Sequence, residues 1–593
     1  MSEKAKQLIF WVITITFPFL ILLLIEGALR IGGYNEEAQD LFIEAPNSNR
    51  FLVSNVKFIE RYFPSFVPEI APNAFRKIKQ KNTFRVFVFG GSSTQGFPYN
   101  FYYSFSDQLE QRLLLNTEGV NVEVINLGMT AVNSYVIQDL SKKVLEYEPD
   151  AIIIYAGHNE YYGSFGAAST QFGFVNNVAL KRFIIWLKNF RFYQVLESLM
   201  SSDNTDSGER RTMMAKVIND SNINLDGDIY NHGIKQYQTN LDDVLNRFSD
   251  NNIPVFIGTI ASKLRNQEPL TENEEALNSY AEGDSLFAAL DTVSALKKYI
   301  EARELDGIRF RAPNKINEVI REVATSNGAI VVDVENMIRS KSQSKIEDES
   351  LFIDHLHPNY IGHQLIADLF LEYILEIPRL KSRIISNEFN VPEAISTFEN
   401  AHANVAIARL LVGYPFKKNI SIDEELSAFD AIYESYKSTS YIDSAAAVAS
   451  KTLQFVPEVL TEVINELQNR QDSVEAIAHY YELLKWQLNS IDLIEKGIEY
   501  AVNNRETDEY LVNLLLQTLN DGSYDPRYMD VLSSLYLLRG NTNNAEYWLK
   551  ESERLDPSSP RMLYNYTRFH LLKGDTLKVQ QYYQRFLESQ NGN

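Results

Sequence analysis

From Phe84 onward, short apolar runs alternate with segments whose apolar residues recur at helical spacing. The runs are rich in Val, Ile and Phe and lie at Arg85–Phe89, Val122–Leu127, Ala151–Ala156, Pro254–Ile260 and Ala329–Val334. The helical segments between them lie at Phe105–Leu115, Ser134–Leu145, Tyr237–Phe248 and Ile316–Thr325. Strands that alternate with helices predict right-handed crossovers and a parallel sheet with helices on both faces. The class is therefore α/β, and near-continuous apolar runs indicate strands buried on both sides.

Two insertions interrupt this alternation. The first, 161–230, is rich in aromatic residues, and its segment Arg182–Leu187 predicts short amphipathic helices. The aromatic stripe in 161–200 could line a ligand pocket, lie against a membrane or pack on the core, and packing is the default expectation. The second, 266–312, predicts a helical hairpin with a turn at Gly283 and Asp284.

After Ile377 the strand pattern disappears and the chain is helical throughout. Near the end a period of 34 residues relates Pro526 to Pro560, Gly540 to Gly574 and Trp548 to Tyr582. This is the tetratricopeptide period, in which helix pairs bury their faces by stacking on neighbours, and 395–520 resembles degenerate copies. A generic helical bundle is the alternative. Stacked repeats form extended concave surfaces, so a protein partner could bind there.

The N-terminus contains a candidate membrane span. Leu8–Ile25 is eighteen residues long, carries no charge and follows Lys4 and Lys6. At ~1.5 Å per residue it spans about 27 Å, close to the ~30 Å of a bilayer's hydrocarbon core. A cleaved signal peptide is the alternative, but 25–30 offers no convincing small-x-small cleavage site. Basic residues before the span and acidic ones after it favour a cytoplasmic N-terminus, with the remainder in the periplasm or outside.

These patterns divide the chain into five parts. We expect a cytoplasmic N-terminus at 1–7, a transmembrane helix at 8–25, a linker and packing segment at 26–80, an α/β domain at 81–377 and an α-helical tetratricopeptide-like domain at 378–593.

Composition excludes several functions. The formal net charge is −22, which argues against a nucleic-acid partner because phosphate contacts need a basic surface. The chain of 593 residues contains no Cys, which excludes disulfides, thiolate zinc sites and a cysteine nucleophile. Its eight histidines lie mostly apart, without a metal-binding spacing such as HExxH, so we expect neither a metal nor a cofactor.

Candidate catalytic residues follow the predicted strands. Ser92 comes after the first strand, Gly128 after the second and Asn159 after the third, and Asp354 and His357 come after the last. Open parallel sheets bind ligands at the carboxyl ends of their strands, so we expect these residues to converge. Ser92 would be a nucleophile, His357 its base and Asp354 the group that orients the imidazole. The backbone N–H groups of Ser92 and Gly128, with the Asn159 amide, would stabilise an oxyanion.

This set resembles the SGNH/GDSL hydrolase superfamily, which is named for a Ser, Gly, Asn and His in four sequence blocks. The matching residues are Ser92 in Gly-Gly-Ser-Ser, Gly128, Asn159 in Gly-His-Asn-Glu, and Asp354-x-x-His357, in the family's order, over about 80 to 375. The resemblance implies a three-layer α/β/α fold and acyl-ester hydrolysis or transfer without a metal. The first block departs from Gly-Asp-Ser-Leu, which affects the subfamily and substrate more than the mechanism. The anchor and helical tail, added to this domain, resemble a group of bacterial envelope proteins.

Two catalytic positions have competitors. Ser93 adjoins Ser92, and the alignment of the blocks favours Ser92. His355 competes with His357, and a spacing of three residues favours His357 because it lets an Asp and a His meet at a turn. We expect His363 in the core or on a helix surface.

Four further polar residues are weaker candidates. His158 could touch the substrate or be structural, and Glu160 is expected to cap a helix or form a salt bridge. Arg309 and Arg311 could hold an anionic substrate group, but neutralising nearby carboxylates is the favoured interpretation.

Three functions follow. The leading hypothesis is a membrane-anchored serine hydrolase that cleaves an acyl ester of a glycan or lipid outside the cytoplasm. The second is an O-acyltransferase that modifies an envelope glycan. The third is a scaffold whose helical repeats bind a protein, with a secondary or inactive hydrolase core.

Overall fold

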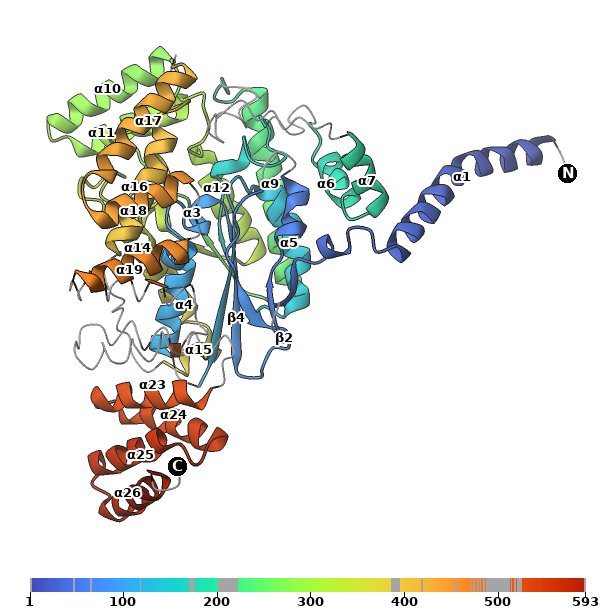
Figure 1. Cartoon of the computed structure of the whole chain (residues 1–593). Coiled ribbons are helices and arrows are strands. Elements are labelled where there is room, and N and C mark those ends of the chain that lie inside the picture. Colours follow the sequence, from blue (N-terminus) through green and yellow to red (C-terminus); the bar gives the residue numbers. More distant parts are fainter. Residues whose placement is uncertain are drawn as a thin grey trace.

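The computed structural model describes residues 3–590 except 46–47, 64–66, 118, 170–175, 201–221, 385–394, 418–419, 453, 455 and most of 471–524. The first helix, α1 (Glu3–Ile31), extends away from an α/β body, and further helices follow that body in the chain (Figure 1). Parts of the insertion predicted at 161–230 and of the degenerate repeats predicted at 395–520 lie outside the described residues.

The centre of the body is a parallel sheet of five strands. They are β4 (Thr83–Gly90), β5 (Asn121–Gly128), β6 (Ala151–Tyr155), β7 (Val255–Gly258) and β8 (Ile330–Val332). Their order is β5-β4-β6-β7-β8, and every neighbouring pair is parallel. All five predicted runs form strands, and every residue of β4 and β6 is buried, as a strand covered on both faces requires.

Helices cover both faces of this sheet. The helices α4 (Phe105–Asn116) and α14 (Tyr360–Ile374) pack on one face, and α5 (Ser134–Val144), α9 (Asp228–Asp250) and α12 (Asn314–Asn327) pack on the other (Figure 1). The predicted three-layer α/β/α architecture is confirmed. The four helical segments expected from the sequence lie within these helices, except that Leu145 falls one residue beyond the end of α5.

The segment 26–80, predicted as a linker and packing segment, contains a small antiparallel sheet. Its strands are β1 (Phe42–Ala45), β2 (Ser48–Ser54) and β3 (Ala74–Arg76), in that order. Phe42 and Phe75 contact Phe87 of β4, with ring centroids 6.2 and 6.0 Å apart. The segment therefore extends the core of the α/β body, a role that its short strands do not reveal in the sequence.

The insertion at 266–312 forms the expected helical hairpin, α10 (Glu274–Ala288) and α11 (Thr292–Leu305), but the turn prediction is wrong. Gly283 and Asp284 lie inside α10, and the turn passes through Leu290, whose φ is 65°. A Cβ on Gly283 would lie 2.9 Å from the Tyr299 ring, and the Tyr299 hydroxyl donates to Asp284 Oδ1 at 2.6 Å. These two residues therefore permit close packing between the helices.

The region after the sheet is helical, as predicted. It begins with the short α15 (Pro378–Lys381), whose Leu380 is buried in the α/β core, so that core extends past the predicted boundary at 377. The helices that follow are α16 (Thr397–Leu411), α17 (Ile422–Lys437), α18 (Tyr441–Thr452), α19 (Val456–Asn469), α23 (Pro526–Leu538), α24 (Thr542–Leu555), α25 (Pro560–Leu572) and α26 (Thr576–Gln590). The pairs α23–α24 and α25–α26 begin 34 residues apart.

Close backbone contacts fix the carboxyl end of the sheet. Gly90 of β4 pairs with Gly128 of β5 and with Tyr155 of β6, so three loops begin at the same level. A Cβ on Gly128 would lie 2.4 Å from Gln95 N, in the short helix α3 (Ser92–Gln95) that follows β4. Gly128 thus allows α3 to rest directly on β5.

Glu160 caps α5 from the loop after β6. Its carboxylate accepts hydrogen bonds from the backbone N–H of Ser134 at 3.1 Å and from the Ser134 hydroxyl at 2.7 Å. The predicted capping role is confirmed. Burial raises the pKa of this carboxyl to about 7, although the hydrogen bonds from Ser134 oppose that change.

We predict that Gly128→Ala lowers stability by about 1–3 kcal/mol, because the new Cβ would push α3 away from β5. Differential scanning fluorimetry of the full chain in detergent should show a lower Tm. An unchanged Tm would show that α3 and β5 can separate at no cost.

We also predict that Glu160 makes stability depend on pH. The folded state keeps this proton up to about pH 7, whereas the unfolded chain loses it near pH 4.5. The folded state binds more protons in that window, so stability falls as the pH rises through it. The Tm of the unchanged chain relative to Glu160→Gln should therefore decrease between pH 5 and pH 8. A difference that stays constant with pH would contradict this assignment.

Candidate active site

The first candidate residue is held by the turn between β4 and α3. Ser92 is the first residue of α3 and is partly exposed. The Thr94 hydroxyl donates to Tyr155 O at 2.9 Å, and Asn126 Nδ2 donates to Thr94 O at 3.0 Å. The helix that carries Ser92 is thereby attached to both neighbouring strands.

Ser92, His357 and Asp354 form a hydrogen-bonded chain. His357 Nε2 lies 2.7 Å from Ser92 Oγ, and His357 Nδ1 lies 2.6 Å from Asp354 Oδ2. The backbone N–H groups of Leu356 and His357 donate to Asp354 Oδ1, so the carboxylate closes a local turn. The expected meeting of Asp and His at a spacing of three residues is therefore observed.

The carboxylate of this chain is fully buried and ionised. Burial alone would raise the pKa of Asp354, but its electrostatic interactions and hydrogen bonds with His357 and His355 hold that pKa well below its usual value. An ionised carboxylate fixes the tautomer that carries a proton on His357 Nδ1, which leaves Nε2 to accept the proton of the Ser92 hydroxyl. The arrangement can therefore activate a serine for nucleophilic attack.

Two of the three predicted oxyanion donors are at the nucleophile: the N–H of Ser92 itself and the side-chain amide of Asn159. Ser92 opens α3, so its own N–H has no acceptor within the helix. Asn159 Nδ2 donates to Val132 O at 3.0 Å and lies 2.6 Å from the position of a Cβ on Gly91, which precedes the serine. Its second amide hydrogen is thus carried close to the nucleophile.

The prediction for Gly128 is wrong. Its N–H donates to the side chain of Asn126, at 2.8 Å from Oδ1, and is not available to an oxyanion. The sequence gives no sign of this, because the acceptor belongs to a side chain two residues earlier.

Ala131 is a candidate that sequence reasoning missed. Its φ is 61°, in the left-handed region that residues with a Cβ rarely adopt. Its carbonyl accepts from Ser164 N, and among the described residues its N–H donates to no group. Because Val132 O binds Asn159, Ala131 lies in the loop that faces the same site.

The other histidines are structural. His158 accepts a hydrogen bond from Ala312 N at Nδ1 and lies 3.1 Å from Ala261 O at Nε2, and burial lowers its pKa to about 3. His363 is buried against Phe105, as the core interpretation expected. His355 is buried, with Nδ1 3.4 Å from Asp354 Oδ1, and it does not contact Ser92.

The arginine pair is structural as well. Arg309 is buried and donates to the carbonyls of Ile223 and Glu304. Arg311 donates to Asp306 Oδ2 and to the carbonyl of Lys263. Charge neutralisation, the favoured interpretation, is found for Arg311, whereas Arg309 satisfies backbone carbonyls.

Asp354, His355 and His357 also bring potential metal-ligand atoms within 4.8 Å of one another. Both ring nitrogens of His357, however, are already hydrogen-bonded to Ser92 and Asp354. A metal that used His357 would have to displace one of these bonds.

Aromatic rings from two parts of the chain border the site. Phe97 lies 4.9 Å from the His357 ring, and Phe416, from the loop after α16, lies 4.9 Å from the His355 ring. Glu399 of α16 is buried and accepts from Asn100 N at 2.5 Å, in the loop that carries Phe97. The helical region therefore supports the surroundings of Ser92.

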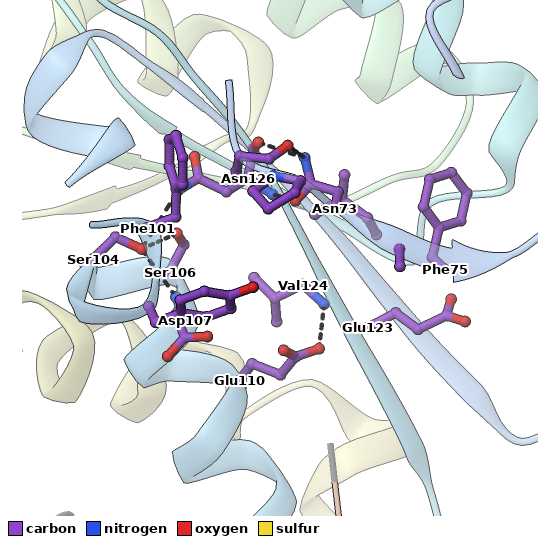
Figure 2. Close-up of a pocket in the computed structure, with 15 residues that line it drawn as sticks. Asn73, Phe75, Phe101, Ser104, Ser106, Asp107, Glu110, Glu123, Val124 and Asn126 are labelled. Carbon is purple, nitrogen blue, oxygen red and sulfur yellow. Dashed lines mark hydrogen bonds between the residues drawn. The ribbon is translucent and has the colours of Figure 1, made fainter. Parts of the chain in front are cut away.

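A separate cavity of about 110 Å³ lies between β3, β5 and α4 (Figure 2). Its lining includes the acidic residues Asp107, Glu110 and Glu123. Glu110 Oε1 accepts from Val124 N at 3.0 Å, and Glu123 binds Arg85. The residues of the Ser92–His357–Asp354 chain do not line it, so it is a structural feature of the sheet edge.

Several solved structures resemble part of this chain. A G-D-S-L family lipolytic protein from Desulfitobacterium hafniense is 12% identical, over 49% of this chain and 98% of that one, with a TM-score of 0.25. The acetylxylan esterase Axe2 from Geobacillus stearothermophilus is 13% identical, over 52% and 100%, with a TM-score of 0.28. The psychrotrophic esterase EstA from Pseudoalteromonas sp. is 13% identical, over 50% and 97%, with a TM-score of 0.25.

A search of the curated proteins found no match. Residues 88–365 match the model of the GDSL-like Lipase/Acylhydrolase family. The matched range begins in β4 and ends in α14, and it contains Ser92, Asn159, Asp354 and His357. Residues 88–365 of this chain therefore form a domain of the GDSL-like Lipase/Acylhydrolase type.

Proposed function

We propose that the chain is a membrane-anchored, extracytoplasmic serine hydrolase that cleaves an acyl ester of a carbohydrate or a lipid. The observation that carries the proposal is the hydrogen-bonded chain from Ser92 through His357 to Asp354. A serine, a base in contact with it and a carboxylate that orients the base are the parts required for acyl transfer.

The first half of the reaction forms an acyl-enzyme. Ser92 Oγ attacks the ester carbonyl while His357 Nε2 takes the hydroxyl proton, and Asp354 stabilises the imidazolium. The N–H groups of Ser92 and Ala131 and the Asn159 amide donate to the oxyanion, with Ala131 in place of Gly128. The tetrahedral intermediate collapses, the C–O bond of the ester breaks, and His357 returns the proton to the departing alcohol.

The second half releases the acid. His357 takes a proton from water, which attacks the acyl carbonyl of Ser92, and the Ser92 ester bond breaks as the proton returns to Oγ. No step needs a metal or a cofactor. The ionised, fully buried Asp354 supports the base role of His357 in both halves.

Anchoring is supported by α1. Among the described residues it is the one helix long and apolar enough to cross a membrane, and its apolar residues from Leu8 to Ile25 are largely exposed. Lys4 and Lys6 before the span favour a cytoplasmic N-terminus, which would leave the catalytic domain outside the cytoplasm.

We also propose that the C-terminal helices are tetratricopeptide-like. The 34-residue spacing of α23–α24 and α25–α26 and the continuous apolar cluster from Phe398 to Phe569 support this. Their concave surface would suit a protein partner.

The test of the nucleophile compares two neighbouring serines. In the full chain in detergent, Ser92→Ala should lower turnover of p-nitrophenyl acetate and butyrate by roughly a thousandfold or more and abolish labelling by a fluorophosphonate probe. Ser93→Ala is the matched control, because Ser93 makes one 3.4 Å contact to Leu356 O. Its activity should stay within about threefold. Equal rates for the Ser92 variant and the unchanged chain would refute the proposal.

Asn159→Ala should reduce kcat by about 10²–10³-fold, because the variant loses one donor to the oxyanion but keeps the hydrogen-bonded chain of Ser92, His357 and Asp354. KM for p-nitrophenyl acetate should change little, since the donor acts mainly on the transition state. Fluorophosphonate labelling at Ser92 should persist at a reduced rate. A variant with unchanged kcat would show that Asn159 serves only as a hydrogen-bond donor to the Val132 carbonyl.

A further inference from the structure

Two helices of the first insertion bury charged side chains and expose apolar ones. They are α6 (Val178–Leu187) and α7 (Arg191–Met200), here called the apolar hairpin. Lys181 and Lys188 are 0% and 1% exposed, whereas Phe183 and Trp186 are 50% and 49% exposed. A helix on a water-facing surface normally shows the opposite arrangement.

The buried cations have specific partners. Lys181 Nζ donates to the carbonyls of Phe165, at 2.7 Å, and Gly166, at 3.3 Å. Lys188 pairs with Glu197 of α7. Lys181 and Lys188 therefore face inward together with the buried Ile185, and the apolar residues on the outer side have no protein cover among the described residues.

The exposed side is apolar and partly aromatic. Leu180, Phe183 and Trp186 follow one another at a spacing of three residues on α6, and α7 adds Leu196 and Leu199, 48% and 76% exposed. Phe183 stacks on Trp186 at 5.5 Å. An exposed apolar surface of this kind marks an interaction site, and Trp is enriched where a membrane meets water.

The hairpin is attached to the end of α1. Phe192 N, in the first turn of α7, donates to Glu26 Oε2 at 3.0 Å, and Glu26 also binds Arg30 at 2.7 Å. Arg191 donates to the carbonyls of Leu29 and Arg30. The hairpin thus lies beside the last turn of the apolar helix (Figure 1).

We propose that the apolar hairpin is a second membrane contact, whose Phe183, Trp186 and Leu199 enter the lipid leaflet that surrounds the end of α1. This rests on the membrane anchoring proposed above. The bilayer is the occupant because α7 packs against the end of the candidate span and is joined to it by hydrogen bonds. A single span lets the attached domain tilt and rotate, and a second contact limits that motion relative to the lipid surface.

The absence of Cys from the chain allows a direct test. Phe183→Cys and Leu199→Cys probe the hairpin, Leu20→Cys probes α1, and Val293→Cys, 69% exposed on α11, is the matched control. Each full-length variant is labelled with a nitrobenzoxadiazole maleimide and reconstituted in vesicles of phosphatidylcholine and phosphatidylglycerol that contain a shallow nitroxide lipid. Unchanged turnover of p-nitrophenyl acetate shows that each labelled protein is folded.

The labels at positions 183 and 199 should be quenched at least twofold more than the label at 293, and the label at 20 should also be quenched. If position 20 is quenched while 183 and 199 behave like 293, α1 spans the bilayer and the hairpin proposal is wrong. If position 20 also escapes quenching, the anchoring fails and the hairpin proposal fails with it. Labels at 183 and 199 that are shielded from both the nitroxide lipid and aqueous iodide would indicate a protein cover, such as a second copy, and would also overturn the proposal.

Discussion

The site depends on the backbone pairing at the carboxyl end of β4. Gly90 pairs with Gly128 on one side and with Tyr155 on the other, so the loops that carry Ser92, Ala131 and Asn159 start at one level. A Cβ on Gly90 would lie 1.9 Å from Thr94 Oγ1 and 2.3 Å from Tyr155 O, so only glycine lets α3 turn back onto the sheet there. The strand order β5-β4-β6 makes this the point where the chain direction across the sheet reverses, and such points hold the ligand crevice of open α/β sheets.

The parts of the fold that could be predicted from the sequence are those set by local pattern. The five strands are short apolar runs bounded by polar or glycine residues, and the complete burial of β4 and β6 fits strands covered on both faces. The contact between Asp354 and His357 was predictable because one turn, closed by the Asp354 carboxylate, determines it. Gly128 failed as an oxyanion donor because the partner of a backbone N–H depends on three-dimensional neighbours, here Asn126. Ala131 could not be predicted as an oxyanion donor for the same reason, since its left-handed φ is imposed by the loop around it.

Periodicity also cannot tell which face of a short helix turns inward. The stripe around Phe183 and Trp186 was expected to pack on the core, but the lysines on the opposite side found carbonyl and carboxylate partners inside. A buried ammonium is tolerated only when such partners exist, and the sequence does not show that Phe165 and Gly166 would provide them. The same limit explains Gly283 and Asp284, which are common turn residues but serve here in contact with Tyr299.

The helical region contacts the surroundings of the candidate active site at two places. The loop between α3 and α4 places Phe97 against the His357 ring, and its Asn100 is held by the buried carboxylate of Glu399 in α16. The loop after α16 returns Phe416 to the His355 ring, next to Asp354. A displacement of α16 would therefore move the Phe97 ring beside His357 and the Phe416 ring beside His355. Because a hydrogen bond of 2.7 Å between His357 and Ser92 tolerates little displacement, α16 and the loop after it are placed where they can influence the reactivity of the serine.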